Sequence, residues 1–88
     1  MNWRNTQTGR LVRFGVFLRD LPGALAKLSN LVAQQNANIL HIIHERAAKD
    51  IPIGFSKVIL VLETRGSDYI REIERGLKER GYSLEILS

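Results

Sequence analysis

The sequence Asp20-Leu21-Pro22-Gly23-Ala24-Leu25 marks the point where an apolar strand pattern ends and a helical pattern begins. Pro22 lacks an N–H and has a fixed φ, which suits the first position of a helix. The amides of Gly23 and Ala24 would then point, without intrahelical partners, from a helix end that attracts anions. Asp20 lies just upstream and offers a carboxylate to an ammonium group. The stretch therefore fits an amino acid as ligand; the alternative is that Asp20 only caps the helix.

Six elements are predicted around this stretch, in the order strand, helix, strand, strand, helix, strand. Apolar alternation predicts strands at residues 11–19, 38–46, 54–64 and 82–87. Apolar stripes at helical spacing predict helices at residues 22–35 and 67–80. Asn36 and Gly81 are expected to end the helices in the left-handed conformation, and Ser67 or Asp68 to cap the second. The economical fold is α+β: a ferredoxin-like βαββαβ sandwich, with a four-stranded antiparallel sheet and two helices on one face.

Composition limits the class of protein. The chain has 88 residues, of which 44% are hydrophobic, which indicates one globular domain, and no apolar run is long enough to span a membrane. The absence of cysteine excludes disulfides, thiolate metal sites and cysteine nucleophiles. Residues 1–9 are polar apart from Trp3 and are expected to form a flexible arm or linker before a domain at residues 10–88. We expect a soluble, cytoplasmic protein with no membrane partner.

Two predicted surfaces are more apolar than a solitary domain needs. Lys27 is the only charged residue of the first helix, and the second strand is apolar on both faces, so this strand is either central or covered by a partner. The sheet face away from the helices is predicted to expose Phe17, Ile43, Phe55, Ile59, Val61 and Leu87. Patches of this kind favour self-association. We therefore expect a homodimer formed through Ala24, Leu31 and the second strand.

Catalytic and metal-binding patterns are missing from the sequence. His41 and His44 are three residues apart in a strand, so they face opposite sides of the sheet and cannot ligate one metal locally. The serines have no arrangement with His and Asp that suggests a nucleophile, and no paired carboxylates stand out. We expect neither a metal site nor catalytic residues.

The stretch at residues 20–25, followed by Asn38-Ile39 at the start of the second strand, resembles the ACT domain, a small βαββαβ module that senses amino acids in metabolic enzymes. The resemblance covers about residues 10–88. Residues 44–46, 51–54 and 62–66 are similar to the C-terminal ACT domain of threonine dehydratases that carry a single ACT domain. Departures from the usual pattern are Leu21, where a basic residue is frequent, and Asn36, where glycine is frequent.

The resemblance implies an effector site between the loop that enters the first helix and the second strand, at a dimer interface. Its residues would be Asp20, Pro22, Gly23, Ala24, Leu25, Asn38 and Ile39. The effector would be a small amino acid (isoleucine, valine, serine or threonine) that changes how attached catalytic domains pack. This domain would hold no cofactor, because it lacks the Schiff-base lysine region and the glycine-rich phosphate loop of a pyridoxal-phosphate enzyme. The parent chain would be the threonine ammonia-lyase.

Two alternatives to an amino-acid sensor stay open. The first is a dimerisation module that binds no ligand, which the apolar first helix and second strand favour. The second is an RNA-recognition motif, because residues 53–58 begin like its aromatic signature on the third strand. That match fails at Lys57 and Leu60, where aromatic side chains would be needed. We therefore expect no nucleic acid as partner.

Overall fold

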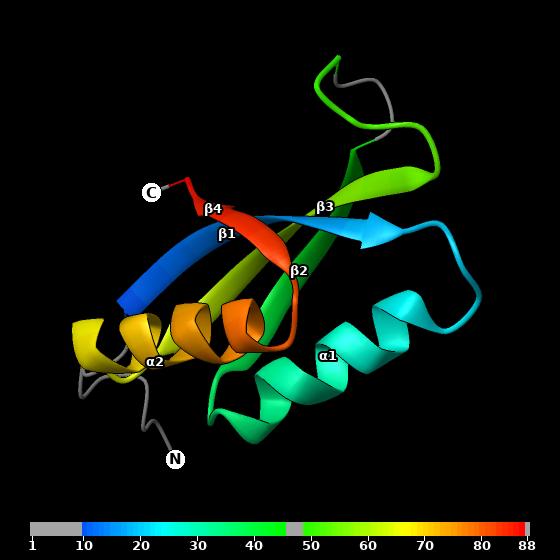
Figure 1. Cartoon of the computed structure of the whole chain (residues 1–88). Coiled ribbons are helices and arrows are strands. Elements are labelled where there is room, and N and C mark those ends of the chain that lie inside the picture. The colour runs from blue at the N-terminus through cyan, green and yellow to red at the C-terminus, as the bar shows by residue number, and fades with distance from the viewer. Residues whose placement is uncertain (1–9, 46–48, 88) are drawn as a thin grey trace.

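A computed structural model describes residues 10–45 and 49–87 as one antiparallel sheet with two helices. The elements are β1 (Arg10–Arg19), α1 (Ala24–Gln34), β2 (Asn38–Glu45), β3 (Phe55–Thr64), α2 (Ser67–Glu79) and β4 (Ser83–Ile86). The strand order is β2-β3-β1-β4, and both helices lie on the same face of the sheet (Figure 1). The predicted βαββαβ order and two-layer architecture are confirmed. The arm predicted for residues 1–9 lies outside the described residues, as does the end of the predicted second strand at Arg46.

The core lies between the sheet and the helices, because alternate residues of the two central strands point toward α1 and α2. None of the core side chains is more than 3% exposed. They are Val12, Phe14, Val16 and Leu18 of β1, Val58, Leu60 and Leu62 of β3, Leu28 and Val32 of α1, and Ile73 and Leu77 of α2. These residues follow the apolar alternation of the strands and the apolar stripes of the helices.

Both helices end where the sequence predicts. Asn36 follows α1 with a φ of 65°, and Gly81 follows α2 with a φ of 92°. After α2 the amides of Gly81 and Tyr82 donate to the carbonyls of Lys78 (3.0 Å) and Leu77 (3.1 Å). These two bonds form a Schellman motif, which satisfies carbonyls that the helix leaves without partners.

The predicted cap of α2 is wrong. The helix begins at Ser67 with Gly66 in the N-cap position, and no side chain donates or accepts a capping hydrogen bond there. The hydroxyl of the buried Thr64 instead accepts from the Gly66 amide (3.4 Å) and donates to the Gly66 carbonyl (3.2 Å). The chain therefore enters α2 through a turn fixed from the end of β3.

The second strand lies at an edge of the sheet, since β2 pairs only with β3. Of the two predicted alternatives, a central position is thus wrong. Leu40, Ile42 and Ile43 are 40–47% exposed, although they lie in a strand of eight residues. A long, apolar edge strand usually acquires a pairing partner or a cover. His41 and His44 pair with Val61 and Val58 and therefore point to opposite faces, as predicted.

The sheet face turned away from the helices is called the open sheet face below. The register places on it Leu11, Arg13, Gly15, Phe17 and Arg19 of β1, Phe55, Lys57, Ile59, Val61 and Glu63 of β3, Asn38, His41, Ile43 and Glu45 of β2, and Ser83 and Glu85 of β4. Leu87 continues the alternation of β4, and its amide donates to the Arg13 carbonyl (2.7 Å). The predicted apolar residues of this face are confirmed.

Candidate functional site

The segment between β1 and α1 is a tight turn whose shape follows from its proline and glycine. Gly23 has a φ of 80° and a ψ of −4°, and the Ala24 amide donates to the Leu21 carbonyl (3.2 Å). These values define a type II turn, which favours proline at its second position and needs a positive φ at its third. The helix starts at Ala24, so the prediction that Pro22 is the first helical residue is wrong. Pro22 sets the turn rather than the helix.

The amides available at this helix end also differ from the prediction. The Ala24 amide is used inside the turn, and the first intrahelical bond runs from the Lys27 amide to the Gly23 carbonyl (3.0 Å). No side chain caps α1, and its first turn contains no acidic residue. Among the described residues, the amides of Gly23, Leu25 and Ala26 therefore have no acceptor. An anion at this helix end would therefore meet the amides of Leu25 and Ala26 rather than that of Ala24.

Asp20 is held by its backbone and leaves its carboxylate exposed. Its amide donates to the Gly54 carbonyl (2.9 Å), which ties the loop before α1 to the loop between β2 and β3. Its side chain forms no hydrogen bond or ion pair with the described residues, so the alternative in which Asp20 caps α1 is wrong. The sequence did not predict the contact between Asp20 and Gly54, because the residues around Gly54 indicate only a turn.

The structure separates the two halves of the predicted site. Arg19, next to Asp20, pairs with Phe55, whereas Asn38 pairs with Glu63. Phe55 and Glu63 are eight residues apart on β3, which corresponds to about 26 Å along the strand. Figure 1 shows the same separation, because α1 starts beside the end of β1 and ends beside the start of β2. Within one chain, residues 20–25 and residues 38–39 do not meet.

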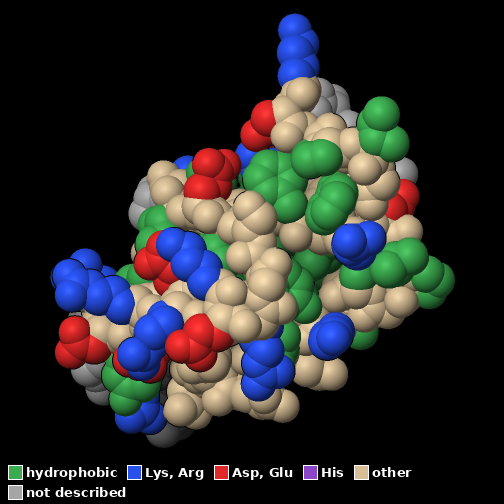
Figure 2. Space-filling view, in the orientation of Figure 1, with side chains coloured by type: hydrophobic (Ala, Val, Ile, Leu, Met, Phe, Trp, Pro, Cys, Tyr) green, Lys and Arg blue, Asp and Glu red, His purple; other side chains and the backbone are tan. Residues whose placement is uncertain are grey.

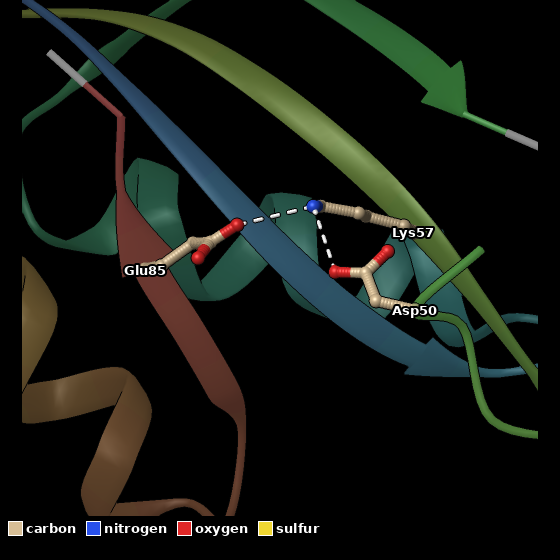
Figure 3. Close-up of polar contacts among 3 residues, drawn as sticks. All are labelled: Asp50, Lys57 and Glu85. Carbon is tan, nitrogen blue, oxygen red and sulfur yellow. Dashed lines mark hydrogen bonds and ion pairs between the residues drawn. The ribbon is translucent and has the colours of Figure 1, made fainter. Parts of the chain in front are cut away.

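The loop between β2 and β3, which the Asp20 amide contacts, is also held by an ion-pair network. Lys57 Nζ lies 3.0 Å from Glu85 Oε2 and 3.5 Å from Asp50 Oδ2 (Figure 3). The hydrogen bond to Glu85 is the main cause that raises the pKa of Lys57 above its ordinary value. The Lys57 stem crosses the sheet over Gly15, where an added Cβ would lie only 3.2 Å from Lys57 Cε. The loop that contacts Asp20 is thus anchored to β4.

Other features of the described residues suggest no further chemistry. Residues 10–45 and 49–87 contain no group of three or more His, Cys, Asp or Glu side chains that could hold a metal ion. In the same ranges no helix is long and apolar enough to cross a membrane. Charged side chains gather on the outer side of α2 (Figure 2), around a shallow hollow of about 350 Å³. Two of the three cations that line it pair within α2, Arg75 with Glu72 at 2.6 Å and Lys78 with Glu74 at 3.1 Å.

Solved structures of other proteins share this architecture. Prephenate dehydratase from Streptococcus mutans superposes with a TM-score of 0.70 at 22% identity, over 88% of this chain and 40% of that one. The ACT domain of GTP pyrophosphokinase from Chlorobium tepidum superposes with a TM-score of 0.67 at 22% identity, over 92% of this chain and 89% of that one. These likenesses define the class of fold, a ferredoxin-like βαββαβ domain.

Sequence comparison then gives the family. The family model for the ACT domain matches residues 12–79, so the chain belongs to the ACT domain family and is a regulatory domain. It is 44% identical over 81 residues to an L-threonine ammonia-lyase of Thermotoga maritima, covering 92% of this chain. It is also 44% identical over 79 residues to an L-threonine ammonia-lyase of Geobacter sulfurreducens, covering 90% of this chain. The chain spans 20% of the length of each of these relatives.

Proposed function

We propose that this domain binds a small amino acid at a subunit interface and thereby regulates a threonine ammonia-lyase. The proposal is supported by the ACT family match and by the 44% identity to two proteins of that name. Because the chain spans only 20% of their length, the pyridoxal-phosphate-dependent reaction would belong to a further part of a longer protein. The cytoplasmic location expected from the sequence, and a domain that begins at residue 10, are parts of the same proposal.

The loop before α1 supplies groups for both ends of an amino acid. The α-carboxylate would accept hydrogen bonds from the amides of Gly23, Leu25 and Ala26, where the helix dipole favours a negative charge. The exposed carboxylate of Asp20 would pair with the ammonium group. Pro22 and Ala24 would act through the turn that they form rather than by direct contact.

One observation carries the proposal that this site is shared between two subunits: about 26 Å of β3 separates the two halves within one chain. Glu45 pairs with Lys57, so the end of β2 lies at the same end of the sheet as Asp20. If the β2 strands of two copies pair antiparallel about a two-fold axis, the start of one strand lies beside the end of the other. Asn38 and Ile39 of the partner subunit would then lie near the loop at residues 20–25.

The exposed edge of β2 is the main contact of this proposed dimer. Leu40, Ile42 and Ile43 are 40–47% exposed on it. Ala24 and Leu31, which the sequence prediction also placed at the interface, are half-buried against the core. Leu31 lies one turn before Gln35 on α1. The Gln35 side chain lies beside Gly76 of α2, because a Cβ added at Gly76 would be 2.8 Å from the Gln35 amide nitrogen. The flank of α1 that carries Leu31 and Gln35 therefore faces α2. The proposal therefore gives Ala24 and Leu31 a smaller share of the contact than β2.

Binding would regulate by selecting one arrangement of subunits. A ligand shifts an equilibrium only by its differential affinity for the two states, and a site completed by two subunits binds only when they are correctly paired. Isoleucine, valine, serine or threonine is the proposed effector. A dimerisation module without a ligand is the second candidate, because the apolar edge of β2 would favour pairing in either case.

The test is a complementation experiment. Asp20→Ala and Asn38→Ala chains are each titrated with the four amino acids, and amide chemical shifts are followed by NMR. Each variant alone should fold, dimerise and lose binding. When equal amounts are mixed and allowed to exchange subunits, half of the dimers carry one intact site out of two, so about a quarter of the sites should be restored.

The outcomes separate the candidates. Saturable shifts at residues 20–26 of the wild type, with recovery in the mixture, would establish a shared effector site. Binding by the wild type without recovery in the mixture would place the site within one chain and refute the shared arrangement. No binding by the wild-type dimer to any of the four amino acids would favour the module without a ligand.

A further inference from the structure

A bulge divides the free edge of β2 into two parts. The pairing of β2 with β3 shifts by one residue between Ile39 and His41, so Leu40 is an extra residue in the strand. A bulge of this kind bends its strand, disrupts the ladder locally and ends regular pairing. From residue 41 to residue 45 the register continues without a further shift. Residues 41–45 are therefore the part of β2 that can pair regularly with another strand.

Symmetry limits how this segment can pair with its own copy. When a two-fold axis perpendicular to the sheet relates two antiparallel strands, one residue lies on the axis and faces its own counterpart. With Ile43 on the axis, His41 faces Glu45 of the partner subunit and the whole segment pairs. With an earlier residue on the axis, the bulge would fall inside the paired segment. With a later residue on the axis, fewer residues of the segment would pair.

The charged side chains of this edge are still available for a partner. His41, Ile43 and Glu45 all lie on the open sheet face. Glu45 is opposite Lys57 of β3, but the Lys57 ammonium is engaged by carboxylates of β4 and of the loop before β3. Among the described residues, the side chains of His41 and Glu45 form no hydrogen bond or ion pair. An acid and a base thus lie unpaired at the two ends of the segment.

The rows of side chains on the open sheet face match when they are continued across the axis at Ile43. In the middle row Ile59 and Ile43 of one copy continue into Ile43 and Ile59 of the other. In the next row Lys57 and Glu45 continue into His41 of the partner subunit, so the charges alternate in sign when histidine is protonated. The two-fold axis repeats this row at the other end of the contact. No like charges face each other in these rows.

We propose that β2 pairs with β2 of a second copy in the register that places Ile43 on the two-fold axis and His41 opposite Glu45 of the partner subunit. This inference rests on the proposed function, which supplies a second copy of this chain as the partner, and it fixes the register that the function leaves open. In this register Asn38 of the partner subunit lies beyond Glu45, toward the end of the sheet at which Asp20 lies.

Single-cysteine variants test the register, because the chain contains no cysteine of its own. On the axis, the Cα atoms of the two copies of residue 43 lie about 4.5–5.5 Å apart, within the range of a disulfide. The two copies of residue 42 lie about 8 Å apart, which is too far. In a glutathione redox buffer, Ile43→Cys should form at least about tenfold more covalent dimer than Ile42→Cys. The two positions are a matched pair, since they are 47% and 40% exposed.

A charge exchange tests the pair between strands, by sedimentation equilibrium of the full 88-residue chain at about pH 5.5, below the ordinary pKa of histidine. His41→Glu and Glu45→Lys should each weaken dimerisation about tenfold, because two attractive pairs become repulsive. The double variant H41E/E45K should associate at least about threefold more tightly than either single variant. Residues 41 and 45 are about 13 Å apart within one chain, so this rescue can only arise between copies. Glu79→Lys, exposed on α2, is the control for net charge and should have no effect.

The outcomes separate this register from the effector site. The proposal is overturned if Ile42→Cys or His41→Cys forms the covalent dimer instead of Ile43→Cys, if none of the three does, or if the double variant associates no better than the single ones. Amino-acid binding by the wild type together with any of these results would leave the proposed function standing. A covalent Ile43→Cys dimer that binds none of the four amino acids would support the register and refute the effector.

Discussion

Replacement of Gly23 by alanine tests the turn that places α1 and the proposed site. At a φ of 80° and a ψ of −4°, Gly23 lies in the left-handed region, and an added Cβ would meet nothing within 4 Å. The whole effect of Gly23→Ala should therefore come from the backbone. An L-residue in this region costs about 1–2 kcal/mol, and the lower entropy of the unfolded chain returns about 0.4–1 kcal/mol. We expect a net loss of about 1 kcal/mol.

Urea unfolding followed by circular dichroism measures this loss, and in a domain of this size it corresponds to a fall in Tm of about 5 °C. The matched control is D-alanine at position 23, introduced by chemical synthesis. D-Alanine adds the same atoms but favours a positive φ, so it should raise stability by about 0.4–1 kcal/mol. The reasoning is refuted if L-alanine leaves the stability unchanged, or if D-alanine destabilises the domain as much as L-alanine does.

Two further predictions concern stability. Gly76→Ala should stabilise α2 by up to about 1 kcal/mol, because alanine favours a helix interior more than glycine does. The added Cβ would lie 2.8 Å from the far end of the flexible Gln35 side chain, which can move aside. A fall in Tm would show that Gln35 cannot move. The raised pKa of Lys57 means that the folded state binds its proton more tightly than the unfolded state. The stability that Lys57 adds should therefore be complete below the ordinary lysine pKa of 10.5 and fade as the pH rises through the higher pKa of the folded state. The difference in unfolding free energy between the wild type and Lys57→Met measures this; a difference that stays constant up to pH 12 would contradict it.

The amino-acid sequence by itself determined the order of elements, the core and the family. Local periodicity carries this information, because a strand that buries one face must alternate and a helix on a sheet must carry a stripe. Leu28 and Val32 in α1 or Leu60 and Leu62 in β3 are assigned to the core by this periodicity alone. Asn36 and Gly81 likewise indicate the ends of both helices, since few other residues adopt a positive φ.

The tertiary structure alone decided how the predicted site residues are distributed. The Pro-Gly pair suited both a helix start and a type II turn, and only the bond from the Ala24 amide to the Leu21 carbonyl separated the two. The position of Asn38 about 26 Å from the loop at residues 20–25 follows from the antiparallel register of β1 and β2 on β3. The contact of Asp20 with Gly54 and the bridge from Lys57 to Glu85 join segments far apart in the chain. Pairings of this kind depend on strand order and register, which no local pattern of residues specifies.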